Sequence, residues 1–115
     1  MSSNDNLVDL FKILADKTRI EILEFLNDKK EKNASWIQKS LNKGQSSISQ
    51  QLKILVNADL LEVRKESRNK FYKIKNPEIY KIINISKAFI SNKTKEELEL
   101  KLQELSSSDI RDTLL

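Results

Sequence analysis

Residues 36 to 57 read WIQKSLNKGQSSISQQLKILVN, and this stretch decides the fold. Four apolar residues in its second half recur at the i, i+4, i+7 and i+8 spacing of one buried helix face: Ile48, Leu52, Leu55 and Val56. In the first half, Ile37 and Leu41 lie four residues apart and predict a shorter helix. The stretch therefore predicts two short helices joined by a tight turn.

The predicted turn contains Gly44, the only glycine in the chain. A sharp turn between helices often needs one residue with positive φ, which glycine adopts without a Cβ clash, so we expect Gly44 to take that conformation. Either Ser46 or Ser47 can cap the helix that follows, and Ser47 with Gln50 matches a capping box. The second helix is therefore predicted over residues 46–57.

The face of this second helix that lies opposite the apolar stripe is polar, rich in amides and hydroxyls, and free of acidic residues. A helix that enters the DNA major groove needs such side chains, because Gln can pair bidentately with adenine and Ser can contact bases or phosphate. The default interpretation of the same residues is a helix cap and a solvated face. We favour DNA contact, and the candidate residues are Gln45, Ser46, Ser47, Ser49, Gln50 and Lys53.

Positive charge is concentrated in one short segment. The chain carries 21 Lys and Arg residues against 17 Asp and Glu residues, a formal net charge of +4 at pH 7. Nearly all of the excess lies in residues 61–75, which contain six basic and two acidic side chains. An excess so localised indicates a local anionic partner rather than general solubility.

The same segment changes from a helical period to a period of two. Apolar and charged residues alternate over residues 61–64 and 72–75, which predicts two half-buried strands around a polar turn at residues 66–69. Lysines on such a hairpin can serve only to protect a sheet edge from aggregation. Because the basic excess is larger than edge protection requires, we favour a hairpin that lies along phosphate or in a minor groove. The candidate contacts are Arg64, Lys65, Arg68 and Lys70, with Arg68 at the tip the strongest.

Composition excludes several classes of function. The chain has no cysteine and no histidine, which rules out disulfides, thiol chemistry, Cys or His metal ligands and the usual histidine general base. It also has no Gly-rich phosphate loop, so we expect no enzyme, no cofactor and no metal site. Its 115 residues suit one domain, its polar start is no signal peptide, and no apolar run approaches the roughly 20 residues that cross a bilayer. We expect a cytoplasmic protein without membrane contact.

The flanking segments predict further helices. Asp16 is a good N-cap for a second helix, whereas residues 27–33 (NDKKEKN) indicate a solvated loop. Asn76 and Pro77 predict a helix start, with Asn as N-cap and Pro at the first helical position. The helix that follows is apolar on more than one face, so we expect it to form a homodimer contact, although it could instead complete a monomer core.

Segments in this order and spacing resemble the ArsR-type prokaryotic repressors, which have a winged helix-turn-helix fold. The matching segments are residues 10–23 (LFKILADKTRIEIL), 45–55 (QSSISQQLKIL), 59–65 (DLLEVRK) and 71–74 (FYKI). The resemblance implies a mainly α (α+β) fold with a two-stranded wing and a C-terminal dimerisation helix. It divides the chain into a disordered tail (1–6), a DNA-binding domain (7–75), a helical dimerisation segment (76–105) and a second tail (106–115).

The family resemblance also implies a function. Members are typically homodimers that bind operator DNA, so the likeness implies a sequence-specific repressor of double-stranded DNA. Helix 46–57 would enter the major groove, and hairpin 61–75 would lie on the backbone or in the minor groove. The first and last helices usually form the dimer contact, which implies an interface of Leu7, Leu10, Phe11, Ile79, Ile82, Ile83 and Phe89.

The sequence departs from the family where metal sensors bind their ion. Sensors often have Cys-x-Cys beside the third helix, and this chain reads NASW at residues 33–36. Metal sensing through Cys or His is therefore excluded, and the sequence does not identify the effector ligand. Two other functions stay open as well: a winged-helix module for protein–protein interaction, and a non-specific architectural DNA-binding protein. The modest net charge argues mildly against the second of these.

Overall fold

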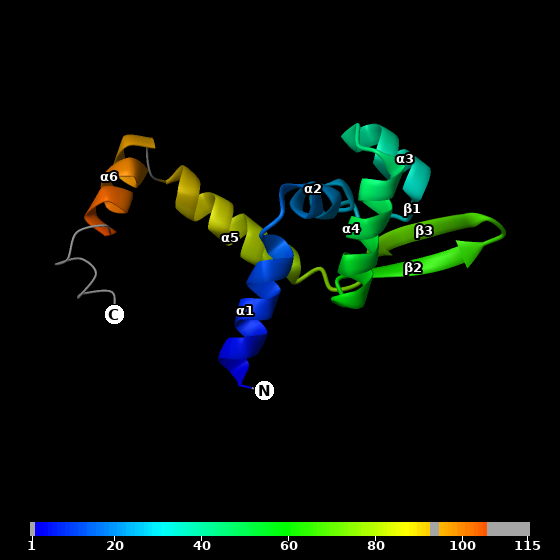
Figure 1. Ribbon diagram of the computed structural model, residues 1–115, viewed down its shortest axis with the longest axis horizontal. Coiled ribbons are helices and arrows are strands. Elements are labelled where there is room, and N and C mark those ends of the chain that lie inside the picture. Colours follow the sequence, from blue (N-terminus) through cyan, green and yellow to red (C-terminus); the bar gives the residue numbers. More distant parts are fainter. Residues whose placement is uncertain (1, 93–94, 106–115) are drawn as a thin grey trace. The chain divides into compact units, whose positions relative to one another are not determined.

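The computed structural model describes residues 2–92 and 95–105 of the chain (Figure 1). The chain forms two compact units, Met1–Pro77 and Glu78–Leu115. In chain order the elements are α1 (Ser3–Leu14), α2 (Lys17–Phe25), β1 (Lys32–Asn33), α3 (Ala34–Leu41), α4 (Gln45–Asn57), β2 (Leu61–Glu66), β3 (Asn69–Ile74), α5 (Ile79–Ser91) and α6 (Lys95–Leu105).

The core of the first unit is formed by apolar side chains of α2, α3 and α4. The predicted α4 stripe is confirmed, since Ile48, Leu52 and Leu55 are at most 1% exposed, and Val56 at its edge is half-buried. Equally buried residues from α2, its C-cap and α3 pack in the same core: Ile22, Leu23, Leu26 and Ile37. Because a fully buried Leu or Ile contributes about 1.5–3 kcal/mol, this cluster holds the three helices together.

The turn between α3 and α4 does not use glycine as expected. Gly44 has φ −70° and ψ 152° and is the N-cap of α4, whereas the left-handed residue is Asn42, with φ 53°. Asparagine tolerates this conformation because its short polar side chain can bond locally, so it ends α3 in place of glycine. The predicted capping box of Ser47 and Gln50 is also wrong, because α4 begins at Gln45 and both serines lie inside its first turn.

In the described part of the chain, the strands form a three-stranded antiparallel sheet in the order β1-β3-β2 (Figure 1). The β2–β3 hairpin confirms the prediction, with Glu66 opposite Asn69 and a positive φ of 55° at Ser67 in the turn. Strand β1 corrects the expectation of a solvated loop over residues 27–33, because Lys32 and Asn33 pair with β3.

Strand β1 was not predicted because its first residue, Lys32, is a charged residue that is buried. Its side chain is only 5% exposed, yet its charge is satisfied, since Nζ lies 2.6 Å from both carboxylate oxygens of Asp28. The ammonium also lies 5.2 Å from the ring centroid of Phe25 and 5.6 Å from that of Trp36. A buried lysine is tolerated when it is paired with a carboxylate and lies over aromatic rings. From the sequence alone, however, a lysine predicts a solvent-exposed position.

Two helix starts also differ from the predictions. Residues 3–6 form the first turn of α1 instead of a disordered tail, because the Ser2 hydroxyl accepts a hydrogen bond from the Asp5 N–H at 3.2 Å. Helix α5 begins at Ile79, because the Asn76 amide donates to the Asp59 carbonyl at 2.6 Å and does not cap the helix. The predicted tail over residues 106–115 lies outside the described residues.

We predict that Gly44→Ser stabilises the protein by about 0.5–1 kcal/mol. The backbone of Gly44 already suits an N-cap serine, and a Cβ there meets nothing within 4 Å. A new hydroxyl can cap α4, and the loss of glycine reduces the entropy of the unfolded chain. Urea denaturation followed by circular dichroism measures the free energy of unfolding.

The matched control places the same side chain two residues earlier. Asn42→Ser should lower the free energy of unfolding by about 1 kcal/mol, because serine gains no comparable local bond in the left-handed region. Stabilisation by Asn42→Ser together with destabilisation by Gly44→Ser would contradict this account of the turn.

Candidate nucleic-acid interface

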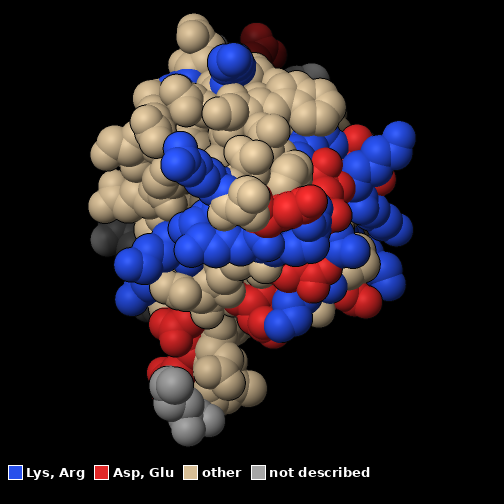
Figure 2. All heavy atoms as spheres, turned by 90° about the vertical axis from the view of Figure 1, so that its right-hand side faces the viewer, with Lys and Arg blue, Asp and Glu red and all other residues tan. Residues whose placement is uncertain are grey.

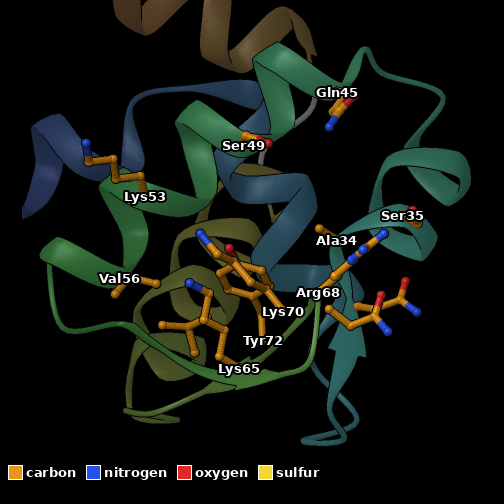
Figure 3. Close-up of a pocket in the computed structure, with 13 residues that line it drawn as sticks. Ala34, Ser35, Gln45, Ser49, Lys53, Val56, Lys65, Arg68, Lys70 and Tyr72 are labelled. Atoms are coloured by element: carbon orange, nitrogen blue, oxygen red, sulfur yellow. The ribbon is translucent and has the colours of Figure 1, made fainter.

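A groove of about 780 Å³ lies between α4, the β2–β3 hairpin and the start of α3 (Figure 3). The lining residues are Asn33, Ala34 and Ser35 before and in α3, Gln45, Ser49, Lys53 and Val56 on α4, and Val63, Lys65, Arg68, Asn69, Lys70 and Tyr72 on the hairpin. Among these described residues, four are basic and none is acidic. The groove therefore offers positive charge and neutral polar groups to a ligand.

Helix α4 presents two adjacent polar rows to solvent. Successive helix residues are about 100° apart, so Gln45, Ser49 and Lys53 fall on the groove side. Ser46 and Gln50 lie farther from the buried stripe and are exposed beside the groove. All six α4 residues that were predicted to contact DNA are exposed. Three of them, Gln45, Ser49 and Lys53, line the groove, whereas Ser46, Ser47 and Gln50 do not.

The hairpin has two faces of different character. Successive side chains of a strand point to opposite faces, and in the β2–β3 register Lys65 lies opposite Lys70 on the groove side. On the other face, Arg64 lies opposite Phe71. Of the four hairpin residues predicted to contact DNA, the structure brings Lys65, Arg68 and Lys70 to the groove and places Arg64 on the opposite face.

Arg64 is already engaged within the chain. Its Nε donates to Glu31 Oε2 at 2.8 Å, and its Nη1 donates to Glu66 Oε2 at 2.6 Å. Its guanidinium also lies 4.7 Å from the ring centroid of Phe71. The hydrogen bonds to Glu66 and Glu31 raise the pKa of Arg64. Because β3 lies between β1 and β2, this cluster reaches across the sheet from β2 to the segment before β1.

The remaining hairpin cations divide in the same way. Lys73 pairs with Glu62 at 3.4 Å, and Lys75 pairs with Asp59, a contact that raises the pKa of Lys75. Three cations of the hairpin have no carboxylate partner within residues 2–92 and 95–105, namely Lys65, Arg68 and Lys70. Figure 2, which looks toward the hairpin tip, shows Lys and Arg side chains gathered in a band across this side.

Sequence reasoning missed Tyr72 as a site residue. Its side chain is buried on the groove side of β3, and this burial raises the pKa of its hydroxyl. Tyr72 follows Lys70 by two residues, so the period of two that predicted the strand could also have placed both on one face. Asn33 was also not predicted as a site residue; it lines the groove, and it caps α3 by accepting a hydrogen bond from the Trp36 N–H at 2.7 Å.

The predicted dimer residues fall into three classes of exposure. Leu7 and Phe11 on α1 and Phe89 on α5 are exposed, whereas Leu10 and Ile82 are half-buried. Ile79 and Ile83 are buried within the single chain. None of the described helices is both long and apolar enough to cross a membrane.

A helix-turn-helix followed by a basic hairpin, with a cationic groove between them, defines a winged helix-turn-helix nucleic-acid-binding protein. Residues 16–63 match the family described as bacterial regulatory protein, arsR family. The chain is 32% identical over 85 residues to the HTH-type transcriptional regulator MJ1325 of Methanocaldococcus jannaschii. This alignment covers 74% of this chain and 96% of that protein. The chain belongs to the ArsR family of transcriptional regulators.

A second relative and one solved structure are also similar to this chain. The chain is 30% identical over 77 residues to the HTH-type transcriptional regulator KmtR of Mycobacterium tuberculosis. This alignment covers 67% of this chain and 58% of KmtR. The fold matches the homodimeric winged helix-turn-helix DNA-binding domain Mb0332 of Mycobacterium bovis with a TM-score of 0.68, at 21% identity, over 80% of this chain and 84% of that one.

We predict that Glu31→Gln makes the hairpin more mobile, because it removes the ion pair that joins Arg64 to the segment before β1. Amide hydrogen exchange across β2 and β3 should become faster, while the free energy of unfolding should change little, since both partners are partly exposed and solvent screens the pair. Glu62→Gln is the matched control, because Glu62 pairs with Lys73 inside the hairpin. Equal exchange in the two variants would show that the cluster around Arg64 does not anchor the hairpin.

Proposed function

We propose that this chain binds double-stranded DNA as a homodimer and represses transcription. Helix α4 would enter the major groove, and the β2–β3 hairpin would lie along the neighbouring backbone or minor groove. The groove beside α4 supports this proposal most strongly, because its described lining includes four cations and no carboxylate. Such a groove, beside an exposed row of hydroxyl and amide side chains, suits phosphate contact and base contact together. Since the relatives are named as transcriptional regulators, we infer a regulatory rather than a catalytic role.

We assign base contact to three α4 residues outside its buried stripe: Ser46 and Gln50, which are exposed beside the groove, and Ser49, which lines it. They are exposed, uncharged and able to donate or accept hydrogen bonds. Gln45, Ser47 and Lys53 would support them at the start of α4 and along the groove. On the hairpin we assign DNA contact to Lys65, Arg68 and Lys70, and we assign Arg64 to the support of the hairpin.

The homodimer is proposed from the apolar surface of α1 and of α5, each taken by itself. On α5, Ile79 and Ile83 share a buried face, whereas Ile82, Ile85 and Phe89 have the i, i+3, i+7 spacing of another. Ile85 is 70% exposed and Phe89 is 61% exposed. Exposed apolar rows of this kind mark interaction surfaces, and the similar Mb0332 domain is described as homodimeric. We therefore assign the contact to the exposed residues of α1 and α5 rather than to Ile79 and Ile83.

The direct test is fluorescence anisotropy of labelled DNA from upstream of the protein's own gene, titrated beside a scrambled duplex at two salt concentrations. We expect much tighter binding to the native duplex, with two chains per site. Equal, salt-sensitive binding to both duplexes would instead indicate an architectural DNA-binding protein or a different operator. Absence of binding to either would favour a module for protein–protein interaction.

In the same assay, Ser49→Ala combined with Gln50→Ala should reduce the preference for the native duplex more than the total affinity. A good base contact contributes about 1–3 kcal/mol of discrimination, whereas binding to random DNA depends on phosphate contacts. Ser40→Ala, which removes an exposed hydroxyl of α3 outside the groove, is the control and should change neither affinity. Equal losses on native and scrambled DNA would contradict base contact by α4.

For the dimer, Ile85→Glu should shift the protein to a monomer in sedimentation velocity, because it places a charge in the exposed apolar row of α5. Asn84→Glu introduces the same charge at an exposed polar position on another face of the helix and should leave the dimer intact. A dimer that persists in Ile85→Glu would place the interface elsewhere.

A further inference from the structure

The hairpin face that lines the groove consists of two unlike pairs of residues. In the β2–β3 register, Val63 lies opposite Tyr72, and Lys65 lies opposite Lys70. All four residues line the groove. Residues two apart in a strand are separated by roughly 7 Å, so an apolar pair lies next to a cationic pair within the length of a small molecule.

The cationic pair is not neutralised by the chain. No carboxylate of residues 2–92 and 95–105 pairs with Lys65 or Lys70, whereas Lys73 on the outer face of the hairpin pairs with Glu62. Like charges directly opposite each other destabilise strand pairing, so a bound anion would relieve a repulsion. Two ammonium groups that face one ligand suit a group with about two negative charges, such as a phosphate monoester.

The apolar pair contains a polar atom that the chain leaves unused. Tyr72 is 7% exposed, which makes it the most deeply buried of the described lining residues. Its hydroxyl has no hydrogen-bond partner in the part of the chain that the structure describes. Because a buried tyrosine usually has such a partner, this hydroxyl is available to a ligand. Figure 3 shows Tyr72 together with Lys65 and Lys70 on the hairpin wall.

Helix α4 repeats the same combination on its own wall. Val56, which is half-buried, follows Lys53 by one helical turn, and both line the groove. Both walls therefore place apolar surface beside positive charge. The groove volume of about 780 Å³ lies within the range of roughly 300–1,000 Å³ that is typical of small-molecule sites. Contact with DNA phosphates uses exposed cations, and it does not account for the apolar walls or for the buried hydroxyl of Tyr72.

We propose that this groove is an effector site for a small organic phosphate monoester. The phosphate would lie between Lys65 and Lys70 and accept a hydrogen bond from the Tyr72 hydroxyl. The apolar body of the ligand would lie against Val63 and Val56. A molecule bound there occupies cations that we assign to DNA contact, so it and DNA exclude each other. The competition rests on the proposed DNA-binding function, whereas the binding of the phosphate monoester does not.

Titration with phenyl phosphate at constant ionic strength, followed in two-dimensional NMR spectra of the backbone amides, tests the site without DNA. We expect saturable shifts in β2, β3 and α4, with a dissociation constant of about 1 mM or below. Inorganic phosphate, which lacks the apolar body, and phenol, which lacks the charge, should each bind several-fold more weakly. Equal binding of inorganic phosphate would show only a charged surface and would overturn the proposal, as would the absence of saturable shifts with phenyl phosphate.

Variants then locate the site. Tyr72→Phe removes the donor and keeps the ring, so it should weaken the binding of phenyl phosphate several-fold in a protein that retains its fold. Lys65→Gln and Lys70→Gln should each weaken it as well. Lys73→Gln, the matched control on the outer face, should leave it unchanged. A loss in Lys73→Gln as large as that in Lys65→Gln, or unchanged binding in Tyr72→Phe, would contradict the assignment.

The effector role is tested by anisotropy of a labelled duplex at constant ionic strength. Phenyl phosphate should weaken the binding of the duplex, and phenol should not. In Tyr72→Phe, several-fold more phenyl phosphate should be needed for the same relative loss. If phenyl phosphate binds the groove but leaves the duplex affinity unchanged, the effector role is excluded. If the unmodified chain binds no duplex at any salt concentration, the proposed function fails and the competition fails with it, while the NMR titration still decides whether the phosphate site exists.

Discussion

The burial of Ile48, Leu52 and Leu55 fixes the rotation of α4 about its own axis, and the rest of the interface depends on this constraint. A helix whose apolar stripe is held in the core has no freedom to choose which side chains face outward. The groove row of Gln45 and Ser49, and the exposed row beside it, follow from the positions of three buried residues. A polar substitution in the stripe would therefore change the orientation of the helix, without removing any side chain that we assign to DNA contact.

A second constraint is the central position of β3, which pairs with β1 on one side and β2 on the other. This arrangement gives the hairpin a groove face and an outer face, and the charges are divided between them. Arg64 and Lys73 on the outer face are held by carboxylates, so they stabilise the hairpin. Lys65 and Lys70 on the groove face are not, so they remain available to an anion. Alternation along a strand thus separates cations that are paired with carboxylates from cations that are not, within a few residues.

Much of this architecture could be predicted from sequence because it depends on short-range periodicity. The stripe of α4 and the alternation of β2 and β3 were correctly predicted, since each is a repeated pattern of apolar residues. The turn was not, because Asn42 and Gly44 both tolerate unusual backbone conformations and only the structure shows which one adopts it. Strand β1 was missed because Lys32 is buried through Asp28 and two aromatic rings, which a count of charged residues cannot reveal.

The residues of the candidate site likewise divide into those that local sequence patterns predict and those that depend on contacts distant in the chain. Residues of α4 could be selected because one helix face is determined locally, but Arg64 and Lys65 are equivalent neighbours in the sequence. Strand alternation puts them on opposite faces, but the sequence does not show which face is neutralised, because the partner of Arg64, Glu31, lies far away in the chain and comes close only through the sheet. Tyr72 was passed over for a related reason, because an aromatic residue in a strand indicates core packing, and its place in the groove depends on how the hairpin lies against α4.

The central claim is that DNA lies against α4 and the groove face of the hairpin, and leaves the outer face free. Limited acetylation of lysines, with and without a short duplex, followed by mass spectrometry of each peptide, tests it most directly. The account predicts that DNA protects Lys53, Lys65 and Lys70 and leaves the reactivity of Lys73 and Lys75 unchanged. Equal protection of the lysines on both faces, or no protection in a complex that demonstrably forms, would contradict it.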